Sequence, residues 1–363
     1  MQWAPEFSGT RAALRLAGLV LWAVVPLLSV QAEAQELRVV LVQYRIGPAQ
    51  DLSLGGFEQR IRRIAGRAVS EHAAELLVFP EYLSVFPMVA DLRQAAAPSA
   101  QTDSAQALSP TTPAPAAPSD HTPSAQVPAA GLSATQRRLV ERVTRAPQQP
   151  VTPRERRQLR ELVRRRVRRY SDPLQRMWSR IADELDVWIL AGSVFVEAAD
   201  GTLRNRAWYF DPQGELVYRQ DKVFLTGFES GLLGLEPGAL AAARPVTIDG
   251  VELGLTICRD SFFDEWHRIF AEVDLWLDIR ANGEPWSREV RRRFDTALPE
   301  RVAQTPVPAG ASTSLNGSFR GLLWQGPAFT VHADGRRERQ APDHDATLLL
   351  PFTVSAASGE PSP

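Results

Sequence analysis

The chain has 363 residues, of which 44% are hydrophobic and 8% aromatic. It can therefore bury a sizeable core, which excludes a chain that is disordered throughout. Forty-one basic side chains against 42 acidic ones leave a net charge of −1, which argues against a nucleic-acid binder. A single cysteine excludes an intramolecular disulfide framework and any zinc or iron–sulfur site built from several cysteines. The five histidines show no metal-ligand spacing, so we expect no metal site.

The first 34 residues have the three regions of a secretory signal peptide. Arg11 and Arg15 precede an apolar run over residues 16–30, and small residues alternate over 31–34. We therefore expect residues 1–34 to be removed from a secreted or periplasmic protein. The alternative is that residues 16–30 remain as a membrane anchor, although a stable span needs about 20 residues.

A strand–helix–strand unit follows. Residues 37–44 predict a buried strand, apolar side chains recur at helical spacing over 57–68, and residues 76–79 form a second apolar run. This order indicates a parallel βαβ unit. Glu81 would then lie at the carboxyl end of the second strand, where α/β folds place functional groups.

The composition changes sharply after this unit. Residues 94–136 are dominated by Ala, Pro, Ser, Thr and Gln. Such a segment buries too little apolar surface to offset its ordering entropy, so we predict a disordered insertion over 94–152. The catalytic domain would then comprise 35–93 and 153–354, followed by a tail over 355–363.

Arginine is concentrated next to this insertion. Residues 137–169 contain 13 Arg against three Glu, and Thr152-Pro153-Arg154-Glu155 is a capping box. An amphipathic helix over 154–170 would carry these arginines on its outer face. They either form a solvated surface whose stems cover apolar groups, or make a weak contact with anionic envelope components.

Further strands and helices alternate to the end of the chain. Two strands flank the turn at residues 211–214, which predicts a hairpin. The other predicted strands cover 187–196, 252–257, 274–279 and 326–332, and the other predicted helices cover 173–185, 262–273 and 287–303.

Three residues have side chains that could act together in catalysis. Glu81 and Cys258 both follow a predicted strand, and Lys222 is the only lysine in an arginine-rich chain. A compact ammonium can fill a tight site where the planar arginine fork cannot. A carboxylate can accept a thiol proton, and a lysine can stabilise an oxyanion. Together they suit nucleophilic acyl transfer. His267, nine residues past Cys258, is better explained as a structural residue.

These segments resemble the nitrilase superfamily, the carbon–nitrogen hydrolases with a Glu-Lys-Cys triad. The similarity runs from about residue 37 to about residue 352. FPEY ending at Tyr82, the hairpin followed by Asp221-Lys222, and GLTICRD around Cys258 are similar to the three family motifs in their family order. The resemblance implies a four-layer αββα sandwich of the α/β class, no metal or organic cofactor, and homodimers or larger assemblies.

The resemblance also implies a role for each residue. Glu81 would be the general base, Lys222 would polarise the substrate and stabilise the oxyanion, and Cys258 would be the nucleophile. Glu229 would orient the substrate as a second glutamate. The backbone N–H of Arg259 would join the oxyanion hole, and its side chain would either bind an anionic substrate group or form an outward ion pair.

The sequence also departs from the family pattern. Phe224 stands where many members have histidine, and Arg259-Asp260 replaces the Trp-Glu that usually follows the cysteine in true nitrilases. This favours small amides over nitriles as substrates. We therefore predict hydrolysis of a non-peptide carbon–nitrogen bond through a cysteine thioester, with release of ammonia or an amine. The alternatives are acyl transfer by the same triad and a catalytically silent binding protein.

Overall fold

The computed structural model describes residues 35–47, 52–94, 132–145, 150–319, 322–341 and 346–356. The predicted signal segment, most of the predicted insertion and residues 357–363 of the tail lie outside these described residues. Among the described residues, no helix has both the length and the apolar character needed to span a membrane.

Strands from the whole length of the chain join in one mixed sheet, in the order β5-β4-β3-β2-β1-β9-β8-β7-β6. The remaining strands attach to this path through β1, β9 and β11. The bounds are β1 Glu36–Arg45, β2 Leu76–Val78, β3 Trp188–Glu197, β4 Leu203–Phe210, β5 Leu216–Asp221, β6 Val246–Ile248, β7 Val251–Ile257, β8 Leu275–Arg280, β9 Ala309–Phe319, β10 Leu322–Trp324, β11 Phe329–His332, β12 Arg337–Gln340 and β13 Leu348–Ser355.

The sheet has two halves that meet at a narrow join. β1 and β9 pair in parallel only where Tyr44 and Arg45 face Leu315 and Asn316. On either side of this join, β1, β2 and β3 are parallel, as are β7, β8 and β9. The carboxyl ends of β2 and β7 are the points at which Glu81 and Cys258 follow.

The side chains of β1 show how the layers are arranged. Val39 and Leu41 pack with Leu255 and Leu277 of the other half-sheet, in a core between the two half-sheets. Val40 belongs to a second core that faces helices. A strand that is buried on both faces must lie between two apolar layers.

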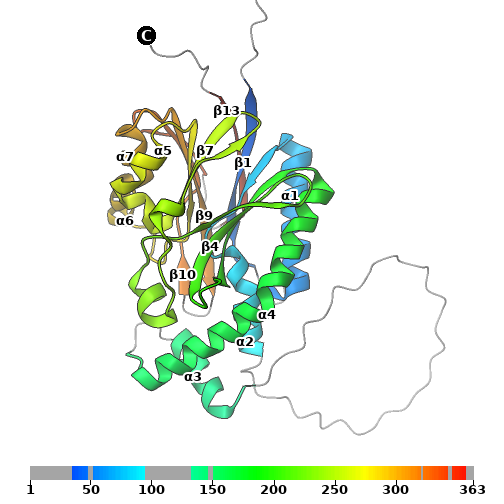
Figure 1. The fold of residues 1–363 in the computed structure, drawn as a ribbon, viewed down its shortest axis with the longest axis vertical. Coiled ribbons are helices and arrows are strands. Elements are labelled where there is room, and N and C mark those ends of the chain that lie inside the picture. The colour runs from blue at the N-terminus through cyan, green and yellow to red at the C-terminus, as the bar shows by residue number, and fades with distance from the viewer. Residues whose placement is uncertain are drawn as a thin grey trace, which may run out of the picture. The chain divides into compact units, whose positions relative to one another are not determined.

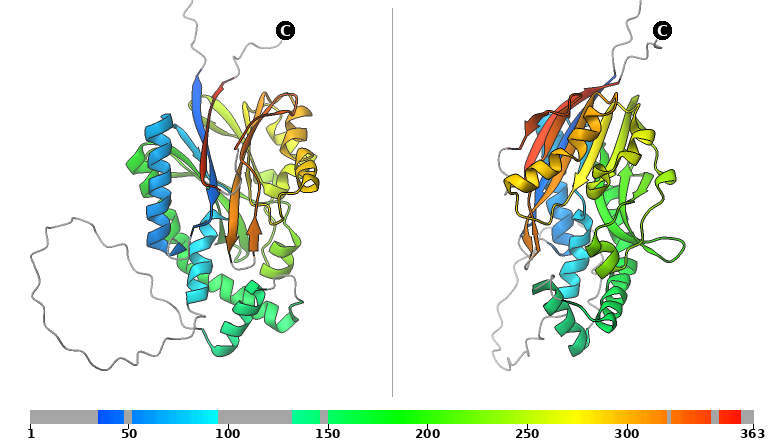
Figure 2. Two further views of the ribbon diagram at one scale, coloured as in Figure 1. Left: turned by 180° about the vertical axis from the view of Figure 1, so that it is seen from behind. Right: turned by 90° about the vertical axis from the view of Figure 1, so that its left-hand side faces the viewer.

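Helices cover the outer face of each half-sheet (Figure 1). Figure 2 shows the two half-sheets between α1 and α4 on one side and the α5–α7 group on the other. Trp276 of β8 packs on this second helical side. The predicted four-layer α/β fold is therefore confirmed. The helices are α1 Leu54–His72, α2 Phe86–Gln94, α3 Ala134–Arg145, α4 Pro153–Leu185, α5 His267–Phe270, α6 Arg288–Asp295 and α7 Leu298–Ala303.

Helix α4 is longer than predicted. It begins at the predicted capping box, with Thr152 as N-cap, and continues through Pro173. The two predicted helices over 154–170 and 173–185 are therefore one helix. The helix continues past the proline because its buried stripe extends through Leu174 and Trp178, and this packing offsets one missing backbone hydrogen bond.

Part of the predicted insertion is helical. Helix α3 lies within residues 94–152, so the prediction of disorder does not hold for residues 134–145. Its Val140 packs with Leu92, Leu132 and Leu162 in a small apolar cluster. The polar composition of the preceding residues concealed this short amphipathic segment.

Two other predicted helices are divided into shorter pieces. The chain over 262–273 begins at the last residue of the 3₁₀ turn η5 (Cys258–Phe262) and then forms a second 3₁₀ turn, η6 (Asp264–Trp266), and the single turn of α5. The predicted helix over 287–303 is broken into α6 and α7, with a proline in the first turn of α7. Proline lacks the N–H that an interior helical position needs, so it starts a new helix.

Candidate active site

Glu81 is held in a sharp turn after β2. Tyr82 adopts the left-handed conformation with φ 60°, and its backbone N–H donates to Ser193 Oγ at 3.0 Å. Gly192, with φ 67°, lies against this turn, and a Cβ at that position would stand 2.1 Å from Pro80 O. Only glycine allows β3 to approach so closely, and this approach fixes the carboxylate of Glu81.

Lys222 directly follows β5. Its backbone N–H donates to Asn205 O at 2.8 Å, and its carbonyl accepts from the N–H of Gly238 at 2.8 Å. The main chain is therefore anchored on both sides of the lysine. The side chain of Lys222 is buried.

Cys258 lies at a strained bend between β7 and η5. Its φ is 54°, a conformation that costs a non-glycine residue about 1–3 kcal/mol. The bend is held by Asp278 Oδ1, which accepts from the Cys258 N–H at 3.1 Å, and by Ser261 Oγ, which donates to the Cys258 carbonyl at 2.8 Å. A nucleophile on such a bend is presented away from its own strand.

The structure brings the predicted triad together. Lys222 Nζ lies 2.7 Å from Glu81 Oε1, and both side chains are fully buried. The thiol of Cys258 faces the Glu81 carboxylate. The Glu81 Oε2 atom has no hydrogen-bond partner in the described part of the chain. A carboxylate oxygen with a free acceptor position beside a thiol is the arrangement a general base requires.

Glu229 joins the same cluster as a second carboxylate. Its Oε2 lies 3.0 Å from Lys222 Nζ and accepts from the N–H and hydroxyl of Thr226 at 2.8 and 2.9 Å. The Tyr82 hydroxyl also donates to Glu229. These contacts show that Glu229 holds Lys222 in place. Its predicted contact with substrate stays a prediction.

Asn205 connects the two glutamates. Its Nδ2 donates to Glu81 Oε1 at 3.0 Å and to Glu229 Oε1 at 2.9 Å. The sequence prediction of the site does not include Asn205, although the alternation of side chains along this strand could have indicated it. On β4, Leu203, Asn205 and Ala207 alternate onto the buried face, so Asn205 is a buried polar residue among apolar ones.

Asp260 ties the lysine segment to the cysteine segment. Its carboxylate accepts from the backbone N–H groups of Val223, Phe224 and Ile257 at 3.2, 2.7 and 3.3 Å. Full burial raises the pKa of Asp260 to about 8 despite these hydrogen bonds. The sequence analysis assigned no role to Asp260, because its partners are main-chain groups from a distant segment.

Burial shifts the pKa values of the side chains in this cluster. Desolvation raises the pKa of Glu81 to about 7, against the opposing effect of the Lys222 charge. Burial would lower the pKa of Lys222, but the charges of Glu81, Glu229 and Cys258 outweigh it, and the net shift is upward. Burial and the charge of Glu81 raise the pKa of the Cys258 thiol. The resting nucleophile is therefore a neutral thiol beside a base poised near neutrality.

Arg259 lies outside this buried cluster. Its side chain is exposed, and the guanidinium lies 5.7 Å from the centre of the Phe263 ring. Within the described residues it forms no ion pair. The outward ion pair, one of the two alternatives for this side chain, is therefore not found among these residues.

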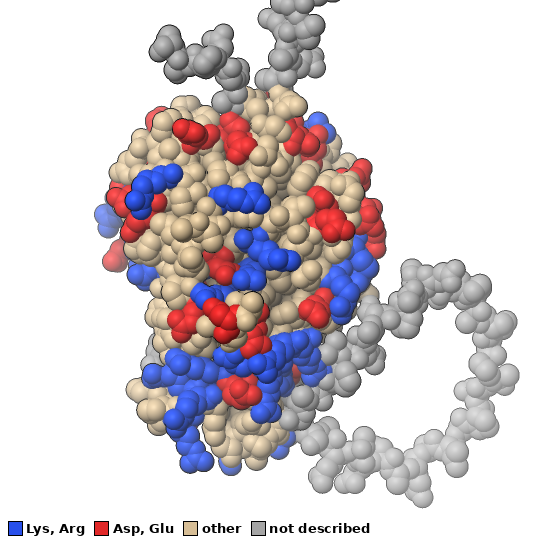
Figure 3. Space-filling model, viewed as in Figure 1, with Lys and Arg blue, Asp and Glu red and all other residues tan. Residues whose placement is uncertain are grey.

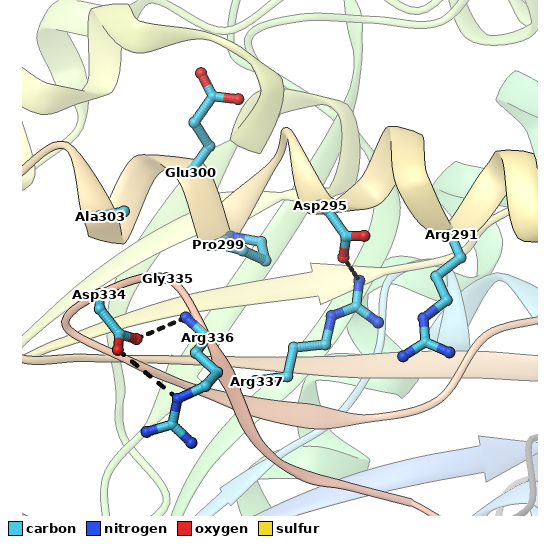
Figure 4. Close-up of a pocket in the computed structure, with 9 residues that line it drawn as sticks. All are labelled: Arg291, Asp295, Pro299, Glu300, Ala303, Asp334, Gly335, Arg336 and Arg337. Carbon is cyan, nitrogen blue, oxygen red and sulfur yellow. Dashed lines mark hydrogen bonds and ion pairs between the residues drawn. The ribbon is translucent and has the colours of Figure 1, made fainter.

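A separate hollow opens on the surface beside α6, α7 and the loop before β12. Its side chains are mostly paired with one another, as in Arg337 with Asp295 at 2.7 Å and Arg336 with Asp334 at 3.7 Å (Figure 4). None of the triad residues lines it. No group of three metal-ligating side chains occurs among the described residues.

The fold and the cluster together define a class: an αββα protein with a buried Glu-Lys-Cys constellation. The family model described as carbon–nitrogen hydrolase matches residues 151–307. The resemblance to the carbon–nitrogen hydrolases of the nitrilase superfamily, predicted from the motifs, is thus confirmed over the matched segment. The matched segment includes Lys222 and Cys258, whereas Glu81 precedes it.

Solved structures share the fold at low sequence identity. A carbon–nitrogen hydrolase from Helicobacter pylori is 16% identical, with a TM-score of 0.57 over 89% of this chain and 90% of that chain. An amidase from Nesterenkonia sp. is 20% identical, with a TM-score of 0.54 over 89% and 92%. A double mutant of that amidase in complex with acrylamide is 19% identical, with a TM-score of 0.53 over the same shares. No curated protein matches the chain.

Proposed function

We propose that this protein hydrolyses a small amide through a thioester on Cys258 and releases ammonia or an amine. The observation that carries this proposal is the buried contact of Lys222 with Glu81, whose carboxylate also neighbours the Cys258 thiol. A carboxylate, an ammonium and a thiol thus lie near one another in one desolvated site, which supports their proposed roles as base, cation and nucleophile. In such a site, fixed charges act more strongly than in water.

The first half of the reaction forms the thioester. Glu81 takes the thiol proton as the Cys258 sulfur bonds to the amide carbon, and the carbonyl oxygen becomes an oxyanion. Lys222 stabilises this oxyanion. The intermediate then collapses, the carbon–nitrogen bond breaks, and protonated Glu81 returns the proton to the leaving nitrogen. Ammonia or an amine departs, and Glu81 is again ionised.

The second half uses water in place of the thiol. Glu81 accepts a proton from water as the water oxygen attacks the thioester carbon. Lys222 again faces the oxyanion, and collapse breaks the carbon–sulfur bond. The proton on Glu81 returns to the Cys258 sulfur, and the carboxylic acid leaves. Both halves need Glu81 to alternate between base and acid, which suits a pKa of about 7.

Two observations support amides as the substrate class. One structure of the Nesterenkonia amidase holds acrylamide, and another shows the acetamide moiety of fluoroacetamide covalently added at its active-site cysteine. In this chain Arg259-Asp260 follows the nucleophile in place of the Trp-Glu that is usual in nitrilases.

Arg259 supports a narrower proposal, that the substrate carries an anionic group. Its exposed guanidinium follows the nucleophile directly and has no acidic partner among the described residues. An Arg–carboxylate contact is charge-assisted and can be bidentate. Replacing Arg259 with Gln should raise KM for amides with a carboxylate and leave KM for neutral amides unchanged. Equal effects on both would contradict this assignment.

The proposed activity is tested by ammonia release from a panel of small amides, carbamoyl compounds and nitriles. Residues 35–363 and the Cys258→Ala variant are compared under reducing conditions. Release that requires Cys258 supports the proposal, and equal release from the variant contradicts it. Acyl transfer is detected by adding an amine acceptor. An acylated amine in place of free acid would replace hydrolysis with transfer as the function.

We also propose export from the cytoplasm and assembly into homodimers or larger assemblies. Export rests on the three signal-peptide regions within residues 1–34, and assembly rests on the family resemblance. Fractionation of expressing cells with N-terminal sequencing tests the first. Light scattering on the purified protein tests the second. Cytoplasmic protein that still begins at residue 1 would contradict export. A strictly monomeric mass would contradict assembly.

A further inference from the structure

The outer face of α4 is covered with arginines, which form a broad basic band over α3 and α4 (Figure 3). Several of them pair with nearby carboxylates on the surface. Arg164 and Arg168 contact Glu197, and Arg165 contacts Glu161. Exposed pairs of this kind contribute little to stability.

Arg160 is bound differently from these surface arginines. Its Nη2 donates to the carbonyls of Ser230 and Gly231 at 3.2 and 2.8 Å, and its Nε donates to Leu232 O at 3.4 Å. All three acceptors lie near the end of η3 (Phe228–Leu233), a single π-helical turn. The last carbonyls of a helical turn lack partners within it and carry partial negative charge, so a guanidinium fits there.

The chain beyond η3 is shaped to admit this guanidinium. Gly234 ends the turn with φ 72°, and a Cβ at that position would stand 2.6 Å from Arg160 Nε. Any other residue would be strained in its backbone and would push against the arginine. The Arg160 side chain of α4 therefore packs closely against the main chain of η3 and of Gly234.

The same turn carries Glu229, the buried carboxylate that contacts Lys222. Glu229 lies in the first turn of η3, and its carbonyl accepts from the N–H of Leu235 at 3.0 Å. Because η3 is only six residues long, fixing its carbonyl end fixes the position of Glu229. We propose that Arg160 is a positioning residue: by binding the carbonyls of η3, it holds Glu229 against Lys222.

This role has a specific electrostatic consequence. The negative charge of Glu229 contributes to raising the pKa of Glu81, after the larger effect of burial. If Glu229 moved away from the cluster, Glu81 would ionise at lower pH and become a weaker base. Lys222 would also lose one of its two carboxylate partners. A change at Arg160 should thus alter the pH dependence of the site, which a purely structural arginine would not do.

The test compares Arg160→Gln with Arg157→Gln, a matched control on the exposed face of the same helix. The first readout is the rate at which 2-iodoacetamide alkylates Cys258 as a function of pH. Because Cys258 is the only thiol, this rate reports one site and needs no substrate. The second is the kcat and KM of ammonia release for the best amide of the panel.

We expect Arg160→Gln to shift the pH profile of alkylation to lower pH and to reduce kcat about tenfold or more, with a smaller change in KM. Arg157→Gln should match the parent in both. Arg160→Lys should be intermediate, since an ammonium can meet fewer of the carbonyls. Gly234→Ala should shift the profile in the same direction as Arg160→Gln.

The kinetic part rests on the proposed amide hydrolysis, and the alkylation part does not. If the parent releases no ammonia but Arg160→Gln still shifts the alkylation profile, the positioning role stands and the proposed function fails. If the alkylation profiles of Arg160→Gln, Gly234→Ala and Arg157→Gln all coincide with that of the parent, the positioning role is overturned. Should Arg160→Gln fail to fold, Arg160→Lys and Gly234→Ala decide by the same profile.

Discussion

The buried triad and the arginine face of α4 contain ion pairs of similar length in opposite surroundings. Lys222 lies 2.7 Å from Glu81 with both side chains excluded from water, whereas Arg165 lies 2.9 Å from Glu161 with more than half of each side chain exposed. In the site, water cannot compensate for a lost partner. On the exposed face of α4, water can solvate a charge that has lost its partner. Distance alone therefore does not indicate which charges matter.

The difference also explains how arginine and lysine are distributed. On the α4 surface any cation suffices, and every one is an arginine. In the triad the cation must approach two carboxylates from a confined position, and there the chain has its only lysine. Arg160 links the two regions, since it starts on the basic helix and ends against the turn that holds Glu229.

The largest expected effect is from removing the buried cation. Lys222→Ala leaves two buried carboxylates without their charge partner, which should cost about 3–5 kcal/mol of unfolding free energy together with all turnover. Lys222→Arg keeps the charge but cannot fit its planar fork into the same place, so it should fold better than Lys222→Ala and remain inactive. Urea unfolding and ammonia release measure the two effects. An active Lys222→Arg variant would show that only the charge matters.

Glu81 should control the pH dependence of catalysis. Its pKa is raised to about 7, so it is protonated below that pH and unable to accept the thiol proton. We expect kcat/KM to fall as pH drops below about 7. Glu81→Gln should reduce kcat about 10²–10⁴-fold and abolish this limb. A parent profile that is flat from pH 5 to pH 8 would remove Glu81 as the base.

Asp260 should contribute to stability and to turnover because its carboxylate holds two main-chain segments together. Asp260→Ala leaves the N–H groups of Phe224 and Ile257 without their acceptor, at a cost of about 1–3 kcal/mol for each group that stays buried and unpaired. Because those groups flank Lys222 and Cys258, kcat should fall as well. Thermal unfolding and kinetics measure both. A variant that loses stability but keeps full kcat would limit Asp260 to folding.

The smallest effects are expected on the α4 surface. Changing Arg154, Arg156 and Arg157 together to Gln should leave unfolding and turnover unchanged, since all three are exposed. The predicted contact with anionic envelope components would appear as salt-sensitive binding of the parent to anionic vesicles, lost in this variant. Equal binding by parent and variant would contradict that contact. Deleting the whole segment is unsuitable, because α4 also supplies core residues.

The triad could be predicted from sequence because its members are conspicuous one by one. Lys222 and Cys258 are each the sole residue of their type, and Glu81 follows an apolar strand. Asn205 and Asp260 could not be assigned in the same way. Their roles depend on partners far along the chain, and aspartate is common elsewhere in the sequence, although Asn205 is one of only three asparagines.

Some strands of the fold can likewise be predicted from the sequence, and others cannot. β1, β7 and β8 are apolar and were predicted, whereas β9 was not. Its buried positions include Ser312 and Thr313, whose hydroxyls bind Asp278 and the carbonyl of Val42 on neighbouring strands. Only the assembled sheet supplies those partners, so the strand lacks the apolar pattern that sequence reasoning relies on.

The most direct test of the account is intact-mass analysis of the protein, quenched in acid within the first turnover of its best amide substrate. We predict an added mass equal to the acyl group, located on the peptide that contains Cys258 and absent from Cys258→Ala. Product formation at full rate with no adduct on Cys258 in the parent would contradict the thioester mechanism.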